Sequence, residues 1–323
     1  MSGVFERIRR HADRHADRHG GRPAVWLASA SLDPALLDPA SPDPALLDPT
    51  SPDPALLDPA SPDPASPGDE MTWLVALARS AGLRGDLVIS NDVTPLVLDV
   101  PAGTGHVVAV CGTGSAFVAS DGMSPLCRVG GCEYLGSDEG SAFDLGLRGL
   151  RASVRGLDGR AERTALADLL ASETGAPAIE LARTLARAPF PKSAVAALAP
   201  LVLHAWRQGD AVAARLVTDA IGELALGVRA ARDAAALRPG WRLSATGGVL
   251  AGSPEFLGEL AAAATRLGAA SVRLITDPAM AVLATLTRLC RAQDSADVVR
   301  LLDRRIGRDV RHVDLGDPGR TVR

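Results

Sequence analysis

The sequence predicts an α/β protein with a mixed sheet. Three short apolar segments, at about residues 106–111, 116–120 and 126–129, are separated by glycine-containing turns, which is typical of antiparallel strands joined by hairpins. From about residue 139 onwards, long segments with helical periodicity alternate with single strands, which is typical of helices packed on a sheet. Antiparallel strands followed by this alternation predict one sheet with both kinds of pairing.

The composition limits the class of protein. A chain of 323 residues exceeds the usual size of one domain, so one large or two moderate cores are expected. Hydrophobic residues make up 47% and charged residues 22%, which is ordinary for a globular protein, and Lys192 is the only lysine. The net charge of −4 gives no attraction to nucleic acid or to an acidic membrane surface. The first twenty residues have no apolar core typical of a signal peptide, so we expect a cytoplasmic location.

The N-terminal third alternates between strand-like and irregular segments. Residues 23–28 form an apolar run that predicts a short strand. A ten-residue repeat rich in Asp and Pro follows over residues 31–70, and its prolines exclude helix or central strand, so a linker is expected. Residues 71–81 have helical periodicity, and residues 86–90 predict a buried strand.

The C-terminal part is expected to be mainly helical. Its predicted helices lie near residues 139–155, 161–173, 177–188, 193–207, 209–237, 254–267 and 278–294. Two strands, at 241–245 and 271–275, interrupt these helices and complete the sheet.

A glycine-rich turn, Gly112-Thr113-Gly114-Ser115, connects two of the predicted strands. Glycines let the backbone approach an anion closely, leaving N–H groups and two hydroxyls for phosphate oxygens. A plain hairpin turn explains the same four residues, and for an isolated motif it is the favoured interpretation.

Three further turns carry polar or small residues. Asp92 follows the strand at 86–90, and ligands of α/β sheets gather at such strand ends. Its carboxylate is suited to accept a proton from a hydroxyl. A role as a helix cap or turn residue fits as well. Residues 137–141 open a helix with acidic groups, which the helix dipole favours and which also suit sugar hydroxyls. Residues 246–249 join a strand to a helix. Their small side chains leave room for a ribose, and a plain tight turn explains them as well.

The four cysteines match no zinc pattern, so free thiols are expected and no metal site is predicted from them. Pairing or metal binding by Cys127 and Cys132 is the alternative, which their poor spacing disfavours.

Taken in order and spacing, these turns resemble the BadF/BadG/BcrA/BcrD-type ATPase family, and within it the N-acetylglucosamine kinases. The likeness runs through Ser90-Asn91-Asp92, Gly112–Ser115, Gly130-Gly131 with Asp138–Ser141, Gly209-Asp210, Thr246–Val249 and Thr276-Asp277-Pro278, and covers about residues 71–293. The resemblance implies an RNase H-like fold of the actin/hexokinase type. Its two lobes close over ATP, Mg²⁺ and an amino sugar, and relatives suggest a homodimer.

The resemblance also implies roles for individual residues in the sugar site. Asp92 is the expected general base facing the sugar hydroxyl, with Asn91 beside it. Gly130, Gly131 and Asp138 are expected to line the sugar pocket.

A second set of roles concerns ATP. Thr113, with the amides of Gly112 and Gly114 and with Ser115, is expected to hold the terminal phosphates. Gly247 and Gly248 are expected to contact the adenosine. Phosphoryl transfer depends mainly on positioning and charge neutralisation, so such a set of groups is suited to a kinase.

The chain departs from the family pattern in three places, one of which is Ser137, where the family's Gly-Asp-Glu-Gly-Ser has its first glycine. The family opens with a DGGGT-type phosphate loop, which this sequence lacks, so we expect an incomplete N-terminal lobe. The Gly-Gly-Trp-Gly of the sugar loop is Gly130-Gly131-Cys132-Glu133 here, without the aromatic residue. We therefore expect a tail and remnant strand at 1–30, the linker at 31–70, the rest of the N-terminal lobe at 71–103, the C-terminal ATPase lobe at 104–295 and a tail at 296–323.

These departures leave four interpretations. The first is an ATP-dependent kinase of an amino sugar such as N-acetylglucosamine. The second is a catalytically impaired relative that binds a sugar, because loss of preorganised groups at a phosphoryl site lowers the rate strongly. The third is a misassigned start of the coding sequence. The fourth is an iron–sulfur activator of the same family, which the position of Cys111 disfavours.

Overall fold

The computed structural model describes most of the chain between residues 103 and 282 and short stretches outside it. The described residues are 24–28, 75–76, 78–80, 82–83, 85–90, 93–97, 99–100, 103–189, 191–282, 284–285 and 310–315. They fall into two compact units, Leu96–Ala281 and Met1–Pro95 with Val282–Arg323. The Asp/Pro-rich repeat lies outside the described residues, and the functional domain boundaries expected above stay a prediction.

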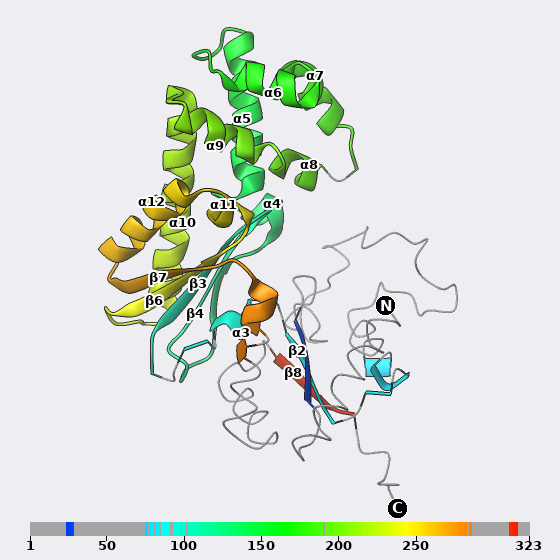
Figure 1. Ribbon diagram of the computed structural model, residues 1–323, viewed down its shortest axis with the longest axis vertical. Coiled ribbons are helices and arrows are strands. Elements are labelled where there is room, and N and C mark those ends of the chain that lie inside the picture. Colours follow the sequence, from blue (N-terminus) through cyan, green and yellow to red (C-terminus); the bar gives the residue numbers. More distant parts are fainter. Residues whose placement is uncertain are drawn as a thin grey trace, which may run out of the picture. The chain divides into compact units, whose positions relative to one another are not determined.

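The larger unit is built on a five-stranded mixed sheet in the order β5-β4-β3-β6-β7 (Figure 1). Its strands are β3 (His106–Cys111), β4 (Ser115–Ser120), β5 (Cys127–Gly130), β6 (Trp241–Thr246) and β7 (Ala269–Ile275). The first three pair antiparallel, whereas β6 runs parallel to β3 and β7 runs parallel to β6. The predicted mixed sheet is therefore confirmed, with the order 3-2-1-4-5 that defines an RNase H-like sheet.

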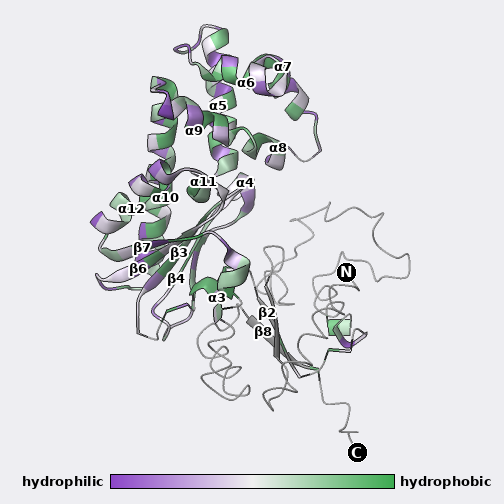
Figure 2. Cartoon of the chain, viewed as in Figure 1, coloured by the Kyte–Doolittle hydropathy of each residue, from purple (hydrophilic) through white to green (hydrophobic). Residues whose placement is uncertain are grey.

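Two long helices cover one face of this sheet. Successive side chains of a strand point to opposite faces, and Val107, Ala109 and Cys111 of β3 all join the core that contains α10 (Ala211–Ala234) and α12 (Pro254–Arg266). Figure 2 shows hydrophobic and hydrophilic bands along both helices, as expected for helices with one buried face. Among the described residues, no helix combines the length and apolarity that crossing a membrane requires.

Five helices lie between residues 142 and 207, and three of them match predicted segments. They are α5 (Ala142–Leu157), α6 (Leu166–Thr174), α7 (Ala178–Leu185), α8 (Lys192–Ala196) and α9 (Ala199–Arg207). The single helix expected at 193–207 is wrong, because α8 and α9 are separate. Pro200 lies in the first turn of α9, the place in a helix where a proline is tolerated.

Side-chain caps fix where the main helices begin. Ser141 accepts the Asp144 amide at 3.3 Å before α5, and Ser253 accepts the Phe256 amide at 3.3 Å before α12. Asp210 accepts the Ala213 amide at 2.8 Å before α10. These caps satisfy backbone donors that the first turn of a helix leaves without a partner.

The smaller unit is described only in part. Its sheet has the order β1-β2-β8, in which β1 (Ala24–Ala28) runs parallel to β2 (Asp86–Ser90) and β8 (Val310–Asp314) pairs antiparallel with β2. The strands at 24–28 and 86–90 agree with the sequence prediction. Strand β8 was not predicted, because its segment alternates charged and apolar residues over only five positions.

Three short helices of the chain were also too brief for periodicity to reveal them: α3 (Thr94–Val97), α4 (Glu133–Gly136) and α11 (Gly248–Gly252).

Candidate functional site

The glycine-rich turn at Gly112–Ser115 joins β3 to β4 and is held by its own backbone. The Gly112 amide donates to the Gly114 carbonyl at 2.9 Å, and the Ser115 hydroxyl donates to the Glu139 carbonyl at 2.9 Å. These groups therefore hold the turn together, and their expected contact with phosphate stays a prediction. Among the described residues, no hydrogen bond reaches the amides of Thr113 and Gly114 or the exposed Thr113 hydroxyl.

The same turn is docked on the start of α5. The amides of Ala142 and Phe143, in the first turn of that helix, donate to the carbonyls of Gly112 and Thr113 at 2.9 and 3.2 Å. These two helix amides are consequently occupied, so what remains for an anion is the outward-facing tip of the turn, at Thr113 and Gly114.

The second predicted nucleotide-binding turn lies directly against the first. Strands β3 and β6 run parallel and in register up to Val110 and Thr246, so the turns that follow them meet at one edge of the sheet. Gly247 has φ +108°, and a Cβ there would lie 2.3 Å from the Cys111 carbonyl oxygen. Only glycine fits this approach, which brings Gly247 and Gly248 next to Gly112.

Asp138 joins the predicted sugar loop to the glycine-rich turn. Its side chain is 4% exposed, its φ is +74°, and its Oδ1 accepts the Ser115 amide at 2.9 Å. A Cβ at position 114 would lie 2.5 Å from that Oδ1, so the carboxylate requires glycine at 114. Oδ2 is buried, and its partner among the described residues is the Lys192 ammonium, 2.9 Å away. A buried carboxylate oxygen with a free lone pair is suited to a ligand hydroxyl.

Lys192 lies against that oxygen. Its ammonium is 2.9 Å from Asp138 Oδ2, close enough to donate to it, and it also contacts the Glu133 carboxylate. Partial burial by itself lowers the pKa of Lys192, but its contacts with Glu133 and Asp138 outweigh that effect and raise its pKa above the ordinary value. The lysine is therefore protonated at neutral pH and stabilises the buried carboxylate.

An aromatic residue also lies in the sugar loop. Gly130 and Gly131 both have positive φ and turn the chain away from β5 into α4. Tyr134, in α4, packs its ring 5.0 Å from the ring of Phe143, and the Lys192 ammonium lies 5.8 Å from the tyrosine ring. The loop thus carries a partly exposed aromatic residue two positions after Cys132, where the family motif has its tryptophan.

The structure brings most of the predicted site residues of the larger unit to one place. The glycine-rich turn contacts the Gly247-Gly248 turn, and Asp138 contacts both Gly114 and Ser115. Gly131 reaches the same cluster through its amide, which donates to the Ser115 carbonyl at 3.2 Å. Asn91 and Asp92 lie outside the described residues, so their roles stay predictions.

Lys192 and Tyr134 were missed from the sequence. One signal in the sequence could have drawn attention to them, because Lys192 is the only lysine of the chain and Tyr134 is the only tyrosine. Neither belongs to a family motif, and the contact between Lys192 and Asp138 depends on how the separate helix α8 packs.

Cys111 is buried at the end of β3, and its thiol donates to the Gly140 carbonyl at 3.4 Å. Burial raises the pKa of this thiol far above its ordinary value, and the charges of Asp138 and Asp144 add to the effect. Cys127 and Cys132 are also free thiols. The Cys111 thiol is thus enclosed and used within the fold.

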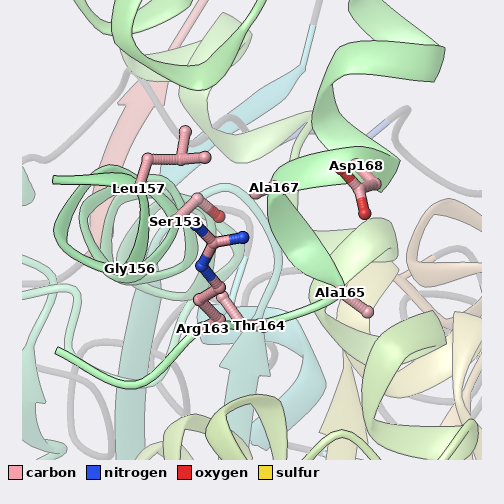
Figure 3. Close-up of a pocket in the computed structure, with 8 residues that line it drawn as sticks. All are labelled: Ser153, Gly156, Leu157, Arg163, Thr164, Ala165, Ala167 and Asp168. Carbon is pink, nitrogen blue, oxygen red and sulfur yellow. The ribbon is translucent and has the colours of Figure 1, made fainter. Parts of the chain in front are cut away.

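A hollow of about 290 Å³ lies elsewhere, between the end of α5 and the start of α6. Figure 3 shows Arg163 extending across it towards Ser153, while Asp168 lies on its far side. The Ser153 hydroxyl donates to the Gly149 carbonyl of its own helix. None of the predicted site residues lines this hollow. The sheet edge, where buried and free polar groups meet, is therefore the better candidate site.

The described residues fit a phosphate better than they fit a magnesium ion. Two amides and a hydroxyl at Thr113 and Gly114 are suited to phosphate oxygens. No group of three or more His, Cys, Asp or Glu side chains in the described part of the chain is arranged to hold a metal. Asp138, the buried carboxylate of the site, is paired with Lys192. We therefore assign no chemical step to Mg²⁺.

A 3-2-1-4-5 mixed sheet with two glycine-rich turns at its carboxyl edge defines an RNase H-like protein of the actin/hexokinase type. The chain belongs to the BadF/BadG/BcrA/BcrD ATPase family, whose model matches residues 97–263. The resemblance stated from the sequence is thereby confirmed. Membership of this family implies use of ATP.

Similar proteins include sugar kinases. An N-acetylmuramic acid/N-acetylglucosamine kinase of Clostridium acetobutylicum is 28% identical over 155 residues, which are 48% of this chain and 51% of that protein. The chain thus spans about half the length of this curated relative. A structure from Porphyromonas gingivalis assigned as an N-acetylglucosamine kinase is 21% identical, with a TM-score of 0.50, covering 68% of this chain and 72% of the other. One from Chromobacterium violaceum with the same assignment is 25% identical, with a TM-score of 0.48, covering 62% and 66%.

Proposed function

We propose that this chain is an ATP-dependent sugar kinase that phosphorylates an amino sugar such as N-acetylglucosamine. The observation that carries the proposal is the meeting of three loops at one sheet edge: the Gly112–Ser115 turn, the Gly247-Gly248 turn and the loop of Asp138. Membership of an ATPase family and similarity to a sugar kinase support it.

In the proposed reaction, the sugar hydroxyl attacks the γ-phosphorus of ATP and ADP leaves. The free amides of Thr113 and Gly114 and the Thr113 hydroxyl hold the terminal phosphate oxygens. Asp138 accepts a hydrogen bond from a sugar hydroxyl that does not react. Asp92 takes the proton of the attacking hydroxyl as general base. Gly247 and Gly248 leave space for the adenosine.

The test is release of ADP from Mg-ATP in the presence of a panel of hexoses and N-acetylhexosamines. We expect Asp92→Ala to lower kcat by about 10²–10⁴-fold, the usual contribution of a general base, without a change in unfolding. The matched control is Asp219→Ala, which removes an exposed carboxylate of α10 that pairs with Arg148 of α5. This variant should keep full activity. Absence of ADP release with every sugar would contradict the kinase assignment.

A second candidate is a sugar-binding relative that does not turn over. Two observations favour it: the sequence contains no DGGGT-type loop, and the described residues hold no carboxylate cluster suited to a metal. Calorimetric titration with N-acetylglucosamine, combined with the ADP-release assay, separates the two candidates. The sugar-binding relative binds N-acetylglucosamine but releases no ADP.

We place this activity in the cytoplasm, acting on a small-molecule sugar. The homodimer suggested by relatives stays a prediction that sedimentation would test. The net charge of −4 argues against nucleic acid as a partner.

A further inference from the structure

We infer that Lys192, held between Glu133 and Asp138, is a specificity-determining residue of the sugar site. Together these three residues form a cluster with excess negative charge that accepts an uncharged N-acetylhexosamine and disfavours a sugar carrying a carboxylate. This inference rests on the proposed function, because it names the substrate class of the same site.

The first support is the geometry of the cluster. The Lys192 ammonium contacts carboxylates from both ends of the sugar loop, Glu133 after the Gly130-Gly131 turn and Asp138 before α5. Lys192 itself comes from a different element, the first residue of α8. Its side chain is 23% exposed, so the ammonium is not sealed from the outside and keeps a third N–H for an acceptor on a ligand.

The second support is the partly satisfied oxygen of Asp138. That side chain is 96% buried, and its Oδ2 has no partner among the described residues besides the Lys192 ammonium, 2.9 Å away. A carboxylate oxygen can accept two hydrogen bonds, so Oδ2 keeps a lone pair for a donor besides Lys192. A sugar hydroxyl supplies this further donor and can accept from Lys192 in return.

The third support is the charge of the cluster. Glu133 and Asp138 contribute −2 and Lys192 contributes +1, so the cluster carries −1 in total. The nearby Asp144 accepts the Gly140 amide and faces Arg148 at 3.7 Å, and Arg148 also pairs with Asp219, so this neighbouring group adds no positive charge. A carboxylate on the substrate therefore meets repulsion, whereas neutral hydroxyl and acetamido groups do not. The Clostridium acetobutylicum relative is named for both a neutral and an acidic amino sugar, so this selectivity would distinguish the present chain.

The experiment compares binding of N-acetylglucosamine with that of N-acetylmuramic acid, which carries a carboxylate, by calorimetry at low salt. We expect the wild-type protein to bind the neutral sugar about fivefold to twentyfold more tightly, the effect of one partly screened charge within the site. Glu133→Gln removes the excess charge and should reduce this ratio to about one. Glu162→Gln, which neutralises another exposed glutamate, paired with Arg215, is the matched control and should leave the ratio unchanged.

A measurement on the unmutated chain places Lys192 at the site. Because it is the only lysine, reductive ¹³C-methylation labels just this side chain and the N-terminal amine. We expect its methyl resonance to shift on addition of N-acetylglucosamine. Lys192→Met should weaken binding of the neutral sugar about tenfold or more, and Lys192→Arg should restore part of the loss.

The outcomes separate this inference from the proposed function. Three results would overturn the role of Lys192 and leave the kinase proposal standing. The first is a wild-type affinity ratio of about one, and the second is a ratio that Glu133→Gln leaves unchanged. The third is a lysine resonance that does not shift although calorimetry records sugar binding. No binding of either sugar at millimolar concentration would overturn both. ADP release with neutral sugars alone, together with the predicted shift, supports both.

Discussion

Two aspartates of the larger unit make similar connections, and the difference between them separates structure from function. Asp210 precedes α10 and accepts the Ala213 amide, while its second oxygen accepts the Thr164 hydroxyl at 2.9 Å and the Ala165 amide at 2.8 Å. Asp138 precedes α5 and accepts the Ser115 amide. Each carboxylate thus ties a helix start to a segment far away in the sequence.

The second oxygen distinguishes the two. In Asp210 both oxygens have hydrogen-bond donors, so the carboxylate is fully used in joining α6 to α10. In Asp138 the second oxygen has one partner, the Lys192 ammonium at 2.9 Å, and keeps a lone pair for a further donor. Both residues belong to family-like motifs, but the satisfied carboxylate points to a role in folding and the partly satisfied one to a role in binding.

Removing the satisfied carboxylate should have the largest effect on stability. Asp210→Ala deletes a helix cap and leaves the Ala165 amide and Thr164 hydroxyl without their acceptor, so we expect the free energy of unfolding to fall by about 2–3 kcal/mol. Urea unfolding followed by circular dichroism measures the change. Asp210→Asn keeps one acceptor oxygen and should lose only about 1 kcal/mol. A loss below about 0.5 kcal/mol in Asp210→Ala would show that this junction is not structural.

The elements that these aspartates connect were largely predictable from the sequence. The strands of the sheet show apolar runs ended by glycine turns, and the longest helices show clear periodicity, so local pattern and tertiary structure agree. The division between α8 and α9 was missed because the apolar pattern continues through Pro200, which is tolerated in a first helical turn. Strand β8 depends on pairing with β2, a long-range contact that no local pattern encodes.

The candidate site was predictable only as a set of turns. Glycine spacing correctly indicated two turns that follow strands. That the turns meet depends on the parallel pairing of β3 and β6, which the spacing does not show. Which amides stay free was not predictable, since the Gly112 and Ser115 groups are used within the fold. The cation beside Asp138 was missed for a related reason, as Lys192 arrives through helix packing.

Removing the charge of the partly satisfied aspartate should affect binding more than stability. In Asp138→Asn the remaining carbonyl oxygen still accepts the Ser115 amide, and Lys192 still has Glu133, so the free energy of unfolding should fall by only about 1 kcal/mol. Affinity for N-acetylglucosamine should fall about tenfold or more, measured by calorimetry, because the acceptor facing the cluster is lost. Equal affinity in the variant and the wild-type protein would place the sugar elsewhere.

The smallest expected effect concerns acid. Partial burial raises the pKa of Asp210, but the hydrogen bonds from Ala213, Ala165 and Thr164 outweigh it and hold the pKa below its ordinary value. A depressed folded-state pKa gives stability that is complete above the unfolded pKa of about 3.9 and disappears as the pH falls through the folded value. The difference in unfolding free energy between the wild-type protein and Asp210→Asn should therefore be constant from about pH 7 to 5.

Below about pH 4 the same difference should shrink, because protonation removes in the wild-type protein the charge that the variant already lacks. Urea unfolding of both proteins at several pH values measures it, and the carboxylates that they share cancel in the comparison. Asp138→Asn, unfolded in parallel, shows whether the acid effect belongs to the junction at α10. A difference that stays constant down to pH 3 would mean that the charge of Asp210 contributes nothing and that its oxygens act only as neutral acceptors.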